Sequence, residues 1–151
     1  LSEYLNFKLQ NIHNNPGNIS NLDKLLLQIA SPRFNNFMEI DHIFPTKGLK
    51  ISNQVDQYLN LNHIGNLCYL SKRNNQIKSN KSPSAYKEYL LTQNEAKFYS
   101  EFISQTFWND LISEKFDGQI NNKAEFDFYL QIRSQRLIKN LITRLSGKKS
   151  E

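Results

Sequence analysis

The segment 37–81 constrains the fold of this chain more than any other part of the sequence. It contains two short apolar runs, FMEI and LCYL, which are separated by a long and mostly polar interval. The first run leads into Asp41 and His42, the second follows Asn66, and a polar stretch that contains Asn75 comes next. This order predicts a strand, a loop, a second strand and a helix. The strands would carry Asp41, His42 and Asn66, and the helix would carry Asn75.

The side chains of this segment suit hydrolysis of a phosphodiester with one metal ion. Asp41 and Asn75 offer hard oxygen ligands, which Mg²⁺ or Mn²⁺ prefers, and Asp41 would be the only acidic side chain of the site. His42 is a candidate general base because imidazole titrates near neutral pH. Neighbouring residues of a strand point to opposite faces, so Asp41 and His42 should diverge, one toward the helix and the other toward the attacking water.

The chain holds twenty asparagines, so the ordered pattern as a whole carries more weight than any one pair. DHIFP, followed by IGNLCYLSKRNNQIKSNK, resembles the HNH (His-Me finger) nucleases. The pattern is most similar to the C-terminal HNH domain of GmrSD-type modification-dependent restriction enzymes. There a His-Ile-x-Pro motif precedes a Gly-Asn-Leu strand and an Asn-bearing helix that ends in Ser-Asn-Lys. The HNH domain of CRISPR effector nucleases is similar in DHI-x-P and in the nine-residue step from Asn66 to Asn75. The resemblance covers residues 37–81 closely and the flanking helices loosely.

The resemblance implies a role for each of four residues. Asp41 matches the acidic metal ligand, His42 matches the general base, and Asn75 matches the last metal ligand, where many HNH enzymes have His. Asn66 matches the residue that braces the loop between the strands and helps to orient the base. The interval from His42 to Asn66 is twenty-four residues, which is longer than in compact HNH motifs. The implied activity is that of a metal-dependent DNA endonuclease in a bacterial restriction or anti-phage system.

Three residues near these positions have more than one interpretation. Asn74 competes with Asn75 as the metal ligand, but helical geometry places it about 100° away, and the step of nine in the family favours Asn75. His63 has either a structural or solvent-exposed role or a contact with DNA. We expect Asn80 to close the helix as its C-cap.

Positive charge is concentrated in the segment 47–81. It holds six basic residues and one acidic residue, Asp56, whereas residues 82–128 hold four basic and eight acidic residues. The net charge of +5 in the first segment equals that of the whole chain. A surface that binds phosphates requires such a concentration. The expected DNA contacts are Lys47, Lys50, Lys72, Arg73, Lys78 and Lys81.

The fold class that we expect is mainly α, with a small embedded ββα-metal motif. The chain would form a single domain over residues 1–151, with an N-terminal helical segment (1–32), the motif (37–81) and C-terminal helices (82–147). The apolar periodicity predicts helices over 1–10, 22–30 and 122–145. A further helix would start at Ser82 and another at Asn94, the latter with a break near 104–106. A two-stranded hairpin is marginal alone, so these helices would hold it.

Two surfaces of the C-terminal helices have alternative interpretations. The aromatic stripe over 98–116 is either core or a platform on which bases stack, and its helical spacing favours core. The polar side of the last helix is either a solvated face or a second strip of phosphate contacts. Its basic residues are Arg133, Arg136, Lys139 and Arg144.

Cysteine usage and hydropathy limit the cellular compartments that suit this chain. Cys68 is the single cysteine, so no internal disulfide or zinc knuckle exists, which fits a reducing cytoplasm and a packing role for its thiol. No apolar run is long enough for a membrane helix. The chain starts at Leu1, so we expect it to be the C-terminal part of a longer protein. By resemblance, an N-terminal regulatory or nucleotide-hydrolysing domain would precede it.

Two other functions remain as alternatives to a nuclease. The first is a nucleic-acid-binding module whose HNH-like site no longer cuts, and the second is a helical interaction domain. If the site is active, it would hydrolyse one strand at a time, so double-strand cutting would need a homo-oligomer or a second event.

Overall fold

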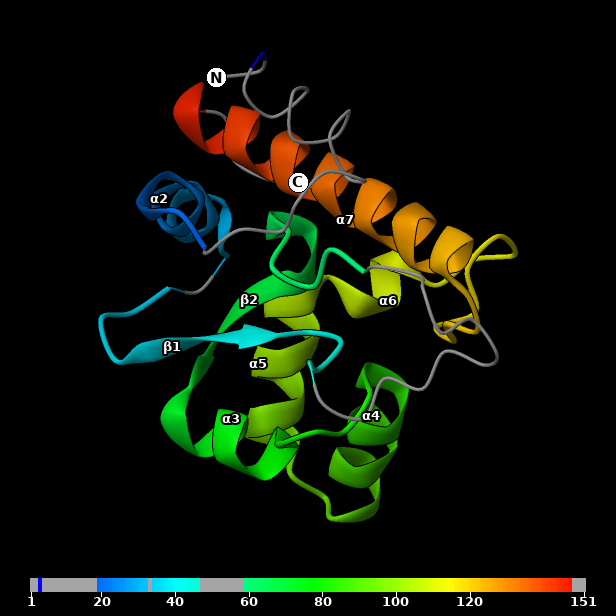
Figure 1. Ribbon diagram of the computed structural model, residues 1–151. Coiled ribbons are helices and arrows are strands. Elements are labelled where there is room, and N and C mark those ends of the chain that lie inside the picture. The colour runs from blue at the N-terminus through cyan, green and yellow to red at the C-terminus, as the bar shows by residue number, and fades with distance from the viewer. Residues whose placement is uncertain (1–2, 4–18, 33, 47–58, 148–151) are drawn as a thin grey trace.

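The computed structural model describes residue 3 and residues 19–32, 34–46 and 59–147 (Figure 1). The predicted helix over 1–10, apart from residue 3, and the predicted DNA contacts Lys47 and Lys50 lie outside these residues. The elements in chain order are α2 (Asn21–Ala30), β1 (Met38–His42), the 3₁₀ helix η1 (Ile64–Asn66), β2 (Leu67–Ser71), α3 (Lys72–Lys78), α4 (Pro83–Thr92), α5 (Ala96–Thr106), α6 (Trp108–Leu111) and α7 (Lys123–Leu145). The described part is therefore mainly helical with one small sheet, as the sequence predicts.

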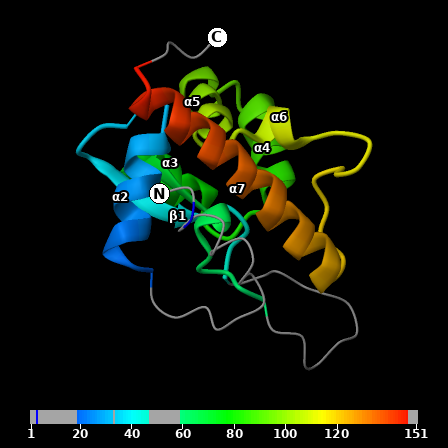
Figure 2. The same cartoon turned by 90° about the horizontal axis from the view of Figure 1, so that it is seen from above.

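β1 and β2 form an antiparallel ribbon, and α3 follows β2 without a break. Met38 pairs with Ser71 at one end of the ribbon, and His42 pairs with Leu67 at the other. α3 contacts both strands, α5 contacts β2, and α7 contacts η1. In Figure 2, α7 runs diagonally between α2 on one side and α4, α5 and α6 on the other. The order of strand, strand and helix is the one predicted for residues 37–81.

An aromatic core lies directly behind the end of β1. Phe44, two residues after β1, packs its ring 4.7 Å from Tyr129 and 5.8 Å from Trp108, measured between centroids. Trp108 in turn contacts Phe116 at 5.7 Å. Phe102, Trp108 and Phe116 are all buried. The buried members of the aromatic stripe over 98–116 therefore form core, as their helical spacing predicts, and anchor the chain that leaves β1.

A second apolar cluster joins α2 to α7 and to the other side of β2. Leu26 and Leu27 of α2 are buried with Leu137 and Leu141 of α7. Ser20 caps α2 by accepting a hydrogen bond from the Asp23 N–H at 3.0 Å. The predicted helix over 22–30 is thus present with one additional residue at its start.

Three boundaries differ from those that the sequence predicts. α3 ends at Lys78, and Ser79 is its C-cap with a φ of 47°, so the prediction that Asn80 caps this helix is wrong. The reason is an early reversal, because the Lys81 N–H already bonds to the Lys78 carbonyl at 3.0 Å. Glu95, and not Asn94, is the N-cap of α5. The helical break falls at Phe107, whose φ is 55°, just after the predicted range.

Arg133 lies in the core and not on the polar side of the last helix, where the sequence pattern placed it. Its Nε donates to the Thr106 carbonyl at 2.9 Å, and its Nη2 donates to the Gln105 and Leu67 carbonyls at 3.0 and 3.2 Å. The last carbonyls of a helix lack partners within that helix, and the C-terminal end attracts positive charge. Arg133 thus satisfies the end of α5 and ties α5, β2 and α7 together.

Among the described helices, none combines the length and the apolar character that crossing a membrane demands.

We expect Arg133→Met to destabilise the fold by about 3 kcal/mol or more, because buried carbonyls left without donors cost about 1–3 kcal/mol each. Arg144→Met, at an exposed position in the last turn of the same helix, is the matched control and should stay within about 0.5 kcal/mol. Urea unfolding followed by circular dichroism measures both. Equal midpoints for the two variants would contradict this role of Arg133.

Candidate functional site

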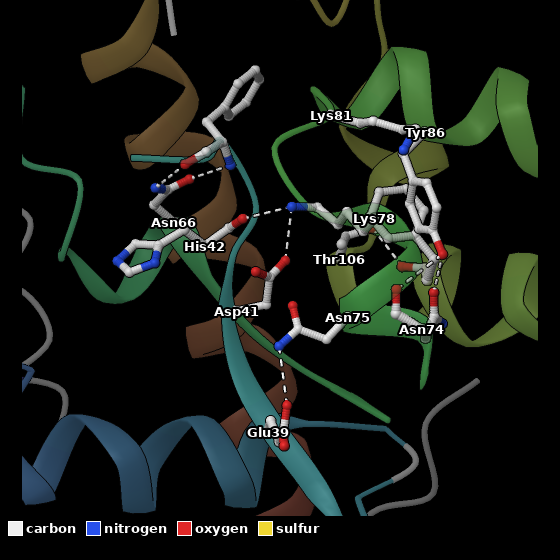
Figure 3. A network of polar contacts seen from close by, with 12 residues as sticks. Glu39, Asp41, His42, Asn66, Asn74, Asn75, Lys78, Lys81, Tyr86 and Thr106 are labelled. Atoms are coloured by element: carbon white, nitrogen blue, oxygen red, sulfur yellow. Dashed lines mark hydrogen bonds and ion pairs between the residues drawn. The ribbon is translucent and has the colours of Figure 1, made fainter. Parts of the chain in front are cut away.

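The candidate site lies between α3 and the end of β1, which are in contact (Figure 3). Asp41 and His42 are the last two residues of β1. Their side chains leave the strand on opposite sides, Asp41 toward α3 and His42 away from it. This is the divergence that strand alternation predicts.

Lys78 of α3 holds the Asp41 carboxylate. Its Nζ lies 2.7 Å from Asp41 Oδ2 and donates to the His42 carbonyl at 2.8 Å. The Lys78 side chain is fully buried, whereas that of Asp41 is 14% exposed. Burial raises the pKa of the Asp41 carboxyl above its usual value, and the Lys78 charge partly opposes that rise. One ammonium group therefore joins α3 to both residues at the end of β1.

Lys78 does not lie on an exposed phosphate-binding face of α3, as the sequence pattern had suggested. The buried residues of this short helix are Asn74 and Lys78, which are four positions apart. Residues with this spacing share one helix face. The face that carries Lys78 is the one that packs inward, and its charge is paired there with Asp41 instead of being presented to solvent.

Asn74 has a structural role within the core. Its Nδ2 donates to the Phe98 carbonyl at 3.2 Å. The Tyr86 hydroxyl donates to the Asn74 side-chain oxygen and to its backbone carbonyl. Asn74 therefore joins α3 to α4 and α5, and its amide points away from β1.

Asn75 faces β1 and Asn74 does not, in line with the separation of about 100° that helical geometry predicts for neighbouring residues. Its Nδ2 donates to Glu39 Oε2 at 3.2 Å. Figure 3 shows its amide oxygen on the side of Asp41 and its amide nitrogen on the side of Glu39. Of the two candidate asparagines, only Asn75 is placed to bind the same cation as Asp41.

Glu39 is a site residue that sequence reasoning missed, and the expectation that Asp41 is the only acid here is wrong. Residues two apart in a strand point to the same face. Glu39 and Asp41 are two apart in β1, and both face α3. That spacing is the signal that could have identified Glu39 from the sequence.

His42 is held by a second residue that sequence reasoning missed, Asn62. The His42 Nε2 lies 2.7 Å from Asn62 Oδ1. An amide oxygen only accepts, so the neutral ring that fits this contact is the tautomer with the hydrogen on Nε2 and the lone pair on Nδ1. No signal in the sequence indicated Asn62, because it is one of many asparagines and lies twenty residues away from His42.

Asn66 braces the loop between the strands, in the way that the resemblance implies. It is fully buried and accepts a bond from the Phe44 N–H at 2.8 Å. Its Nδ2 donates to the carbonyls of Phe44 and Leu61 at 3.0 and 2.9 Å. The His42 ring donates its hydrogen bond to Asn62, so the two functions that were assigned to Asn66 are divided between two residues.

His63 has the structural role that was one of its two interpretations. It is buried at the N-cap of η1, and its Nδ1 accepts a bond from the Gly65 N–H at 3.0 Å. A side chain at Gly65 would approach the Leu130 carbonyl of α7 to 2.8 Å. The turn that places Asn66 therefore packs directly against α7.

The remaining basic residues differ in how they are presented. Lys72 and Arg73 are exposed in the first turn of α3. Lys81 is half-buried, with its Nζ 5.1 Å from the centroid of the Tyr89 ring. On α7, Arg136 lies 3.4 Å from an Asp110 carboxylate oxygen. Within the described part of the predicted DNA-binding set, Lys72 and Arg73 are the residues that face solvent most openly.

The donor set of the site fits a hard cation. The described residues contain no group of three or more His, Cys, Asp and Glu arranged around a common metal position. The oxygens that lie on the same side of the site come from Asp41 and Asn75, and oxygen-only sets suit Mg²⁺ or Mn²⁺ better than Zn²⁺. Burial raises the pKa of the Cys68 thiol to about 12, so this residue, which pairs with Asp41 across the ribbon, remains a protonated packing group.

Comparisons with protein-family models, with curated proteins and with solved structures found no match for this chain.

Replacing Lys78 with Met should destabilise the fold by roughly 3–5 kcal/mol, since removal of one partner strands a buried charge. Asp41→Asn combined with Lys78→Met should be less destabilised than the sum of the two single variants, because the pair is then removed together. Chemical denaturation of all four proteins gives the coupling free energy. Additive losses would show that the two groups do not interact in solution.

Proposed function

We propose that this chain is a metal-dependent DNA endonuclease of the HNH type, the cleavage domain of a bacterial restriction or anti-phage protein. The observation that carries the proposal is the arrangement at the end of β1. Asp41 and the amide oxygen of Asn75 lie on one side of the strand, and His42 lies on the other. This arrangement separates a ligand pair from a base, which is what hydrolysis of a phosphodiester by in-line attack requires.

Asp41 and Asn75 are the residues that would hold Mg²⁺ or Mn²⁺. With two protein oxygens in its shell, such an ion takes its other ligands from water and phosphate. When bound, it would polarise the phosphoryl group and stabilise the charge on the leaving oxygen. Lys78 keeps the Asp41 carboxylate at a fixed position beside α3, so the ligands from β1 and α3 stay in register.

His42 is the proposed general base. The hydrogen bond that Nε2 donates to Asn62 leaves Nδ1 as the nitrogen that accepts a proton from the attacking water. Asn66 fixes the chain that follows, because it bonds to both backbone groups of Phe44. Lys78 fixes the backbone of His42 itself through its carbonyl. Three side chains thus restrain the base.

Lys72 and Arg73 are the proposed phosphate contacts next to the site. Their helix turn is anchored by Glu101 of α5, whose carboxylate accepts hydrogen bonds from the Ser71 N–H and hydroxyl. An exposed cation on a fixed helix end is suited to hold a DNA backbone in register with Asn75 two residues further along.

The full protein would work in the cytoplasm, with an N-terminal regulatory or nucleotide-hydrolysing domain that controls cleavage.

A second candidate function is a DNA-binding module whose HNH-like site does not cut. The observation that favours it is the Lys78 ammonium, which already neutralises the Asp41 carboxylate at 2.7 Å. A cation would then have to share Asp41 with Lys78. Nicking of supercoiled plasmid that depends on Mg²⁺ or Mn²⁺ supports the first function, whereas salt-dependent binding without nicking supports the second.

Changing His42 to Ala should lower the plasmid nicking rate by roughly 10²–10⁴-fold, the usual contribution of a general base. DNA affinity in EDTA and the thermal unfolding midpoint should stay close to those of the unmodified protein, because the ring is half-buried and contacts the end of a loop. The measurement is the initial rate of nicked-circle formation on an agarose gel. Nicking by His42→Ala at the original rate would exclude His42 as the base.

Replacing Lys72 and Arg73 with Ala should reduce the slope of log K against log salt for duplex DNA by about 1.8, since each phosphate contact contributes about 0.9. The matched control replaces Lys139 and Arg144, which are exposed on α7. Fluorescence anisotropy over a range of NaCl concentrations measures both slopes. A smaller slope only in the α7 variant would place the DNA on the last helix instead.

A further inference from the structure

The amide of Asn75 has two chemically different ends, and only its oxygen can bind a cation. An amide that is free to rotate by 180° would present its NH₂ group to Asp41 for much of the time, because a carboxylate attracts N–H donors. In that orientation Asn75 would bond to Asp41 and close the site to a cation. A functional ligand pair therefore needs a group that fixes the orientation of the amide.

Glu39 is placed to fix this orientation. Its Oε2 accepts a hydrogen bond from Asn75 Nδ2 at 3.2 Å. An ionised carboxylate is an acceptor only, so it can hold the NH₂ end of the amide and not the oxygen end. The oxygen is then directed to the side of Asp41, as Figure 3 shows.

The fold keeps Glu39 and Asn75 in register. Glu39 pairs with Leu70, and Asp41 pairs with Cys68, so both acids project from a strand that β2 holds in place. α3 follows β2 directly and is attached to α5 at its start by the Glu101 bonds to Ser71. The strand and the helix turn are both held by the fold, so the backbone positions of Glu39 and Asn75 are fixed relative to each other, and their side chains meet at the surface.

We infer that Glu39 is a positioning residue for the metal site, which selects the ligand-presenting orientation of the Asn75 amide. This inference rests on the proposed function, because it assigns Asn75 as a ligand. Partners of ligating groups typically change metal affinity by about 10- to 100-fold when they are removed. Glu39 acts through Asn75 and not by contact with the reacting atoms.

The test is the affinity of the whole chain for Mn²⁺ in the absence of DNA, measured by electron paramagnetic resonance of the free ion. Glu39→Gln keeps the size of the side chain, but its amide can accept from or donate to Asn75, so the orientation is no longer selected. We expect Mn²⁺ affinity to fall by about tenfold or more. Glu114→Gln, which removes the same charge at an exposed position between α6 and α7, is the control and should leave the affinity unchanged.

The same measurement in a protein that carries Asn75→Asp separates positioning of the amide from loss of the Glu39 charge. Asn75→Asp replaces the amide with a carboxylate, whose two oxygens are equivalent and need no orientation. Glu39→Gln should therefore weaken Mn²⁺ binding at least about tenfold more in the unmodified background than in the Asn75→Asp background. Equal fold-losses in the two backgrounds would overturn the inference, because Glu39 would then act by charge or as a direct ligand.

The proposed function fails in a different way from this inference. If the unmodified protein shows no Mn²⁺ binding that Asp41→Asn weakens, the metal site itself is wrong, and the inference falls with it. If Asp41→Asn weakens binding and Glu39→Gln does not, the metal site stands and only the role of Glu39 is excluded.

Discussion

A single buried ammonium group holds the parts of the candidate site together. Lys78 projects from the inner face of α3 and bonds at the same time to the Asp41 carboxylate and to the His42 carbonyl. Because both contacts come from one nitrogen atom, the helix that carries Asn75 and the strand that carries Asp41 and His42 cannot move independently. A buried ion pair contributes little net stability by itself, but it is costly to break from one side. Its main effect here is to fix geometry.

The rest of the fold supports this contact by satisfying polar groups at the ends of elements. Arg133 donates hydrogen bonds to the carbonyls at the end of α5, and Glu101 of α5 accepts hydrogen bonds from Ser71, the residue before α3. Asn66 closes the loop that leaves β1 through three hydrogen bonds. Each of these side chains is polar and buried or partly buried, and each joins segments that are distant in sequence. A two-stranded ribbon, which is marginal alone, is thereby held at both ends.

Much of the fold follows from local pattern, whereas the partners of the site residues do not. Strand alternation predicted the divergence of Asp41 and His42, and helical geometry predicted that Asn74 and Asn75 face different directions, because both depend on local geometry. The preference for Asn75 came from the nine-residue step in the family that the sequence resembles. The same rules would have identified Glu39, which is two residues before Asp41. Lys78 and Arg133 were placed on exposed faces because charged residues are usually exposed. Only the tertiary packing of α3 and α7 reveals the carbonyl and carboxylate groups that compensate their burial.

The measurement that tests the central claim most directly is conversion of supercoiled plasmid to nicked circle by the purified chain, with Mg²⁺ or Mn²⁺ titrated against EDTA. The arrangement of Asp41, His42 and Asn75 predicts nicking that rises with either ion, saturates, and disappears when the ion is chelated. Nicking that persists in excess EDTA would contradict a mechanism that requires the Asp41–Asn75 ligand pair. Tight DNA binding with no nicking at any ion concentration would contradict the assignment as a nuclease.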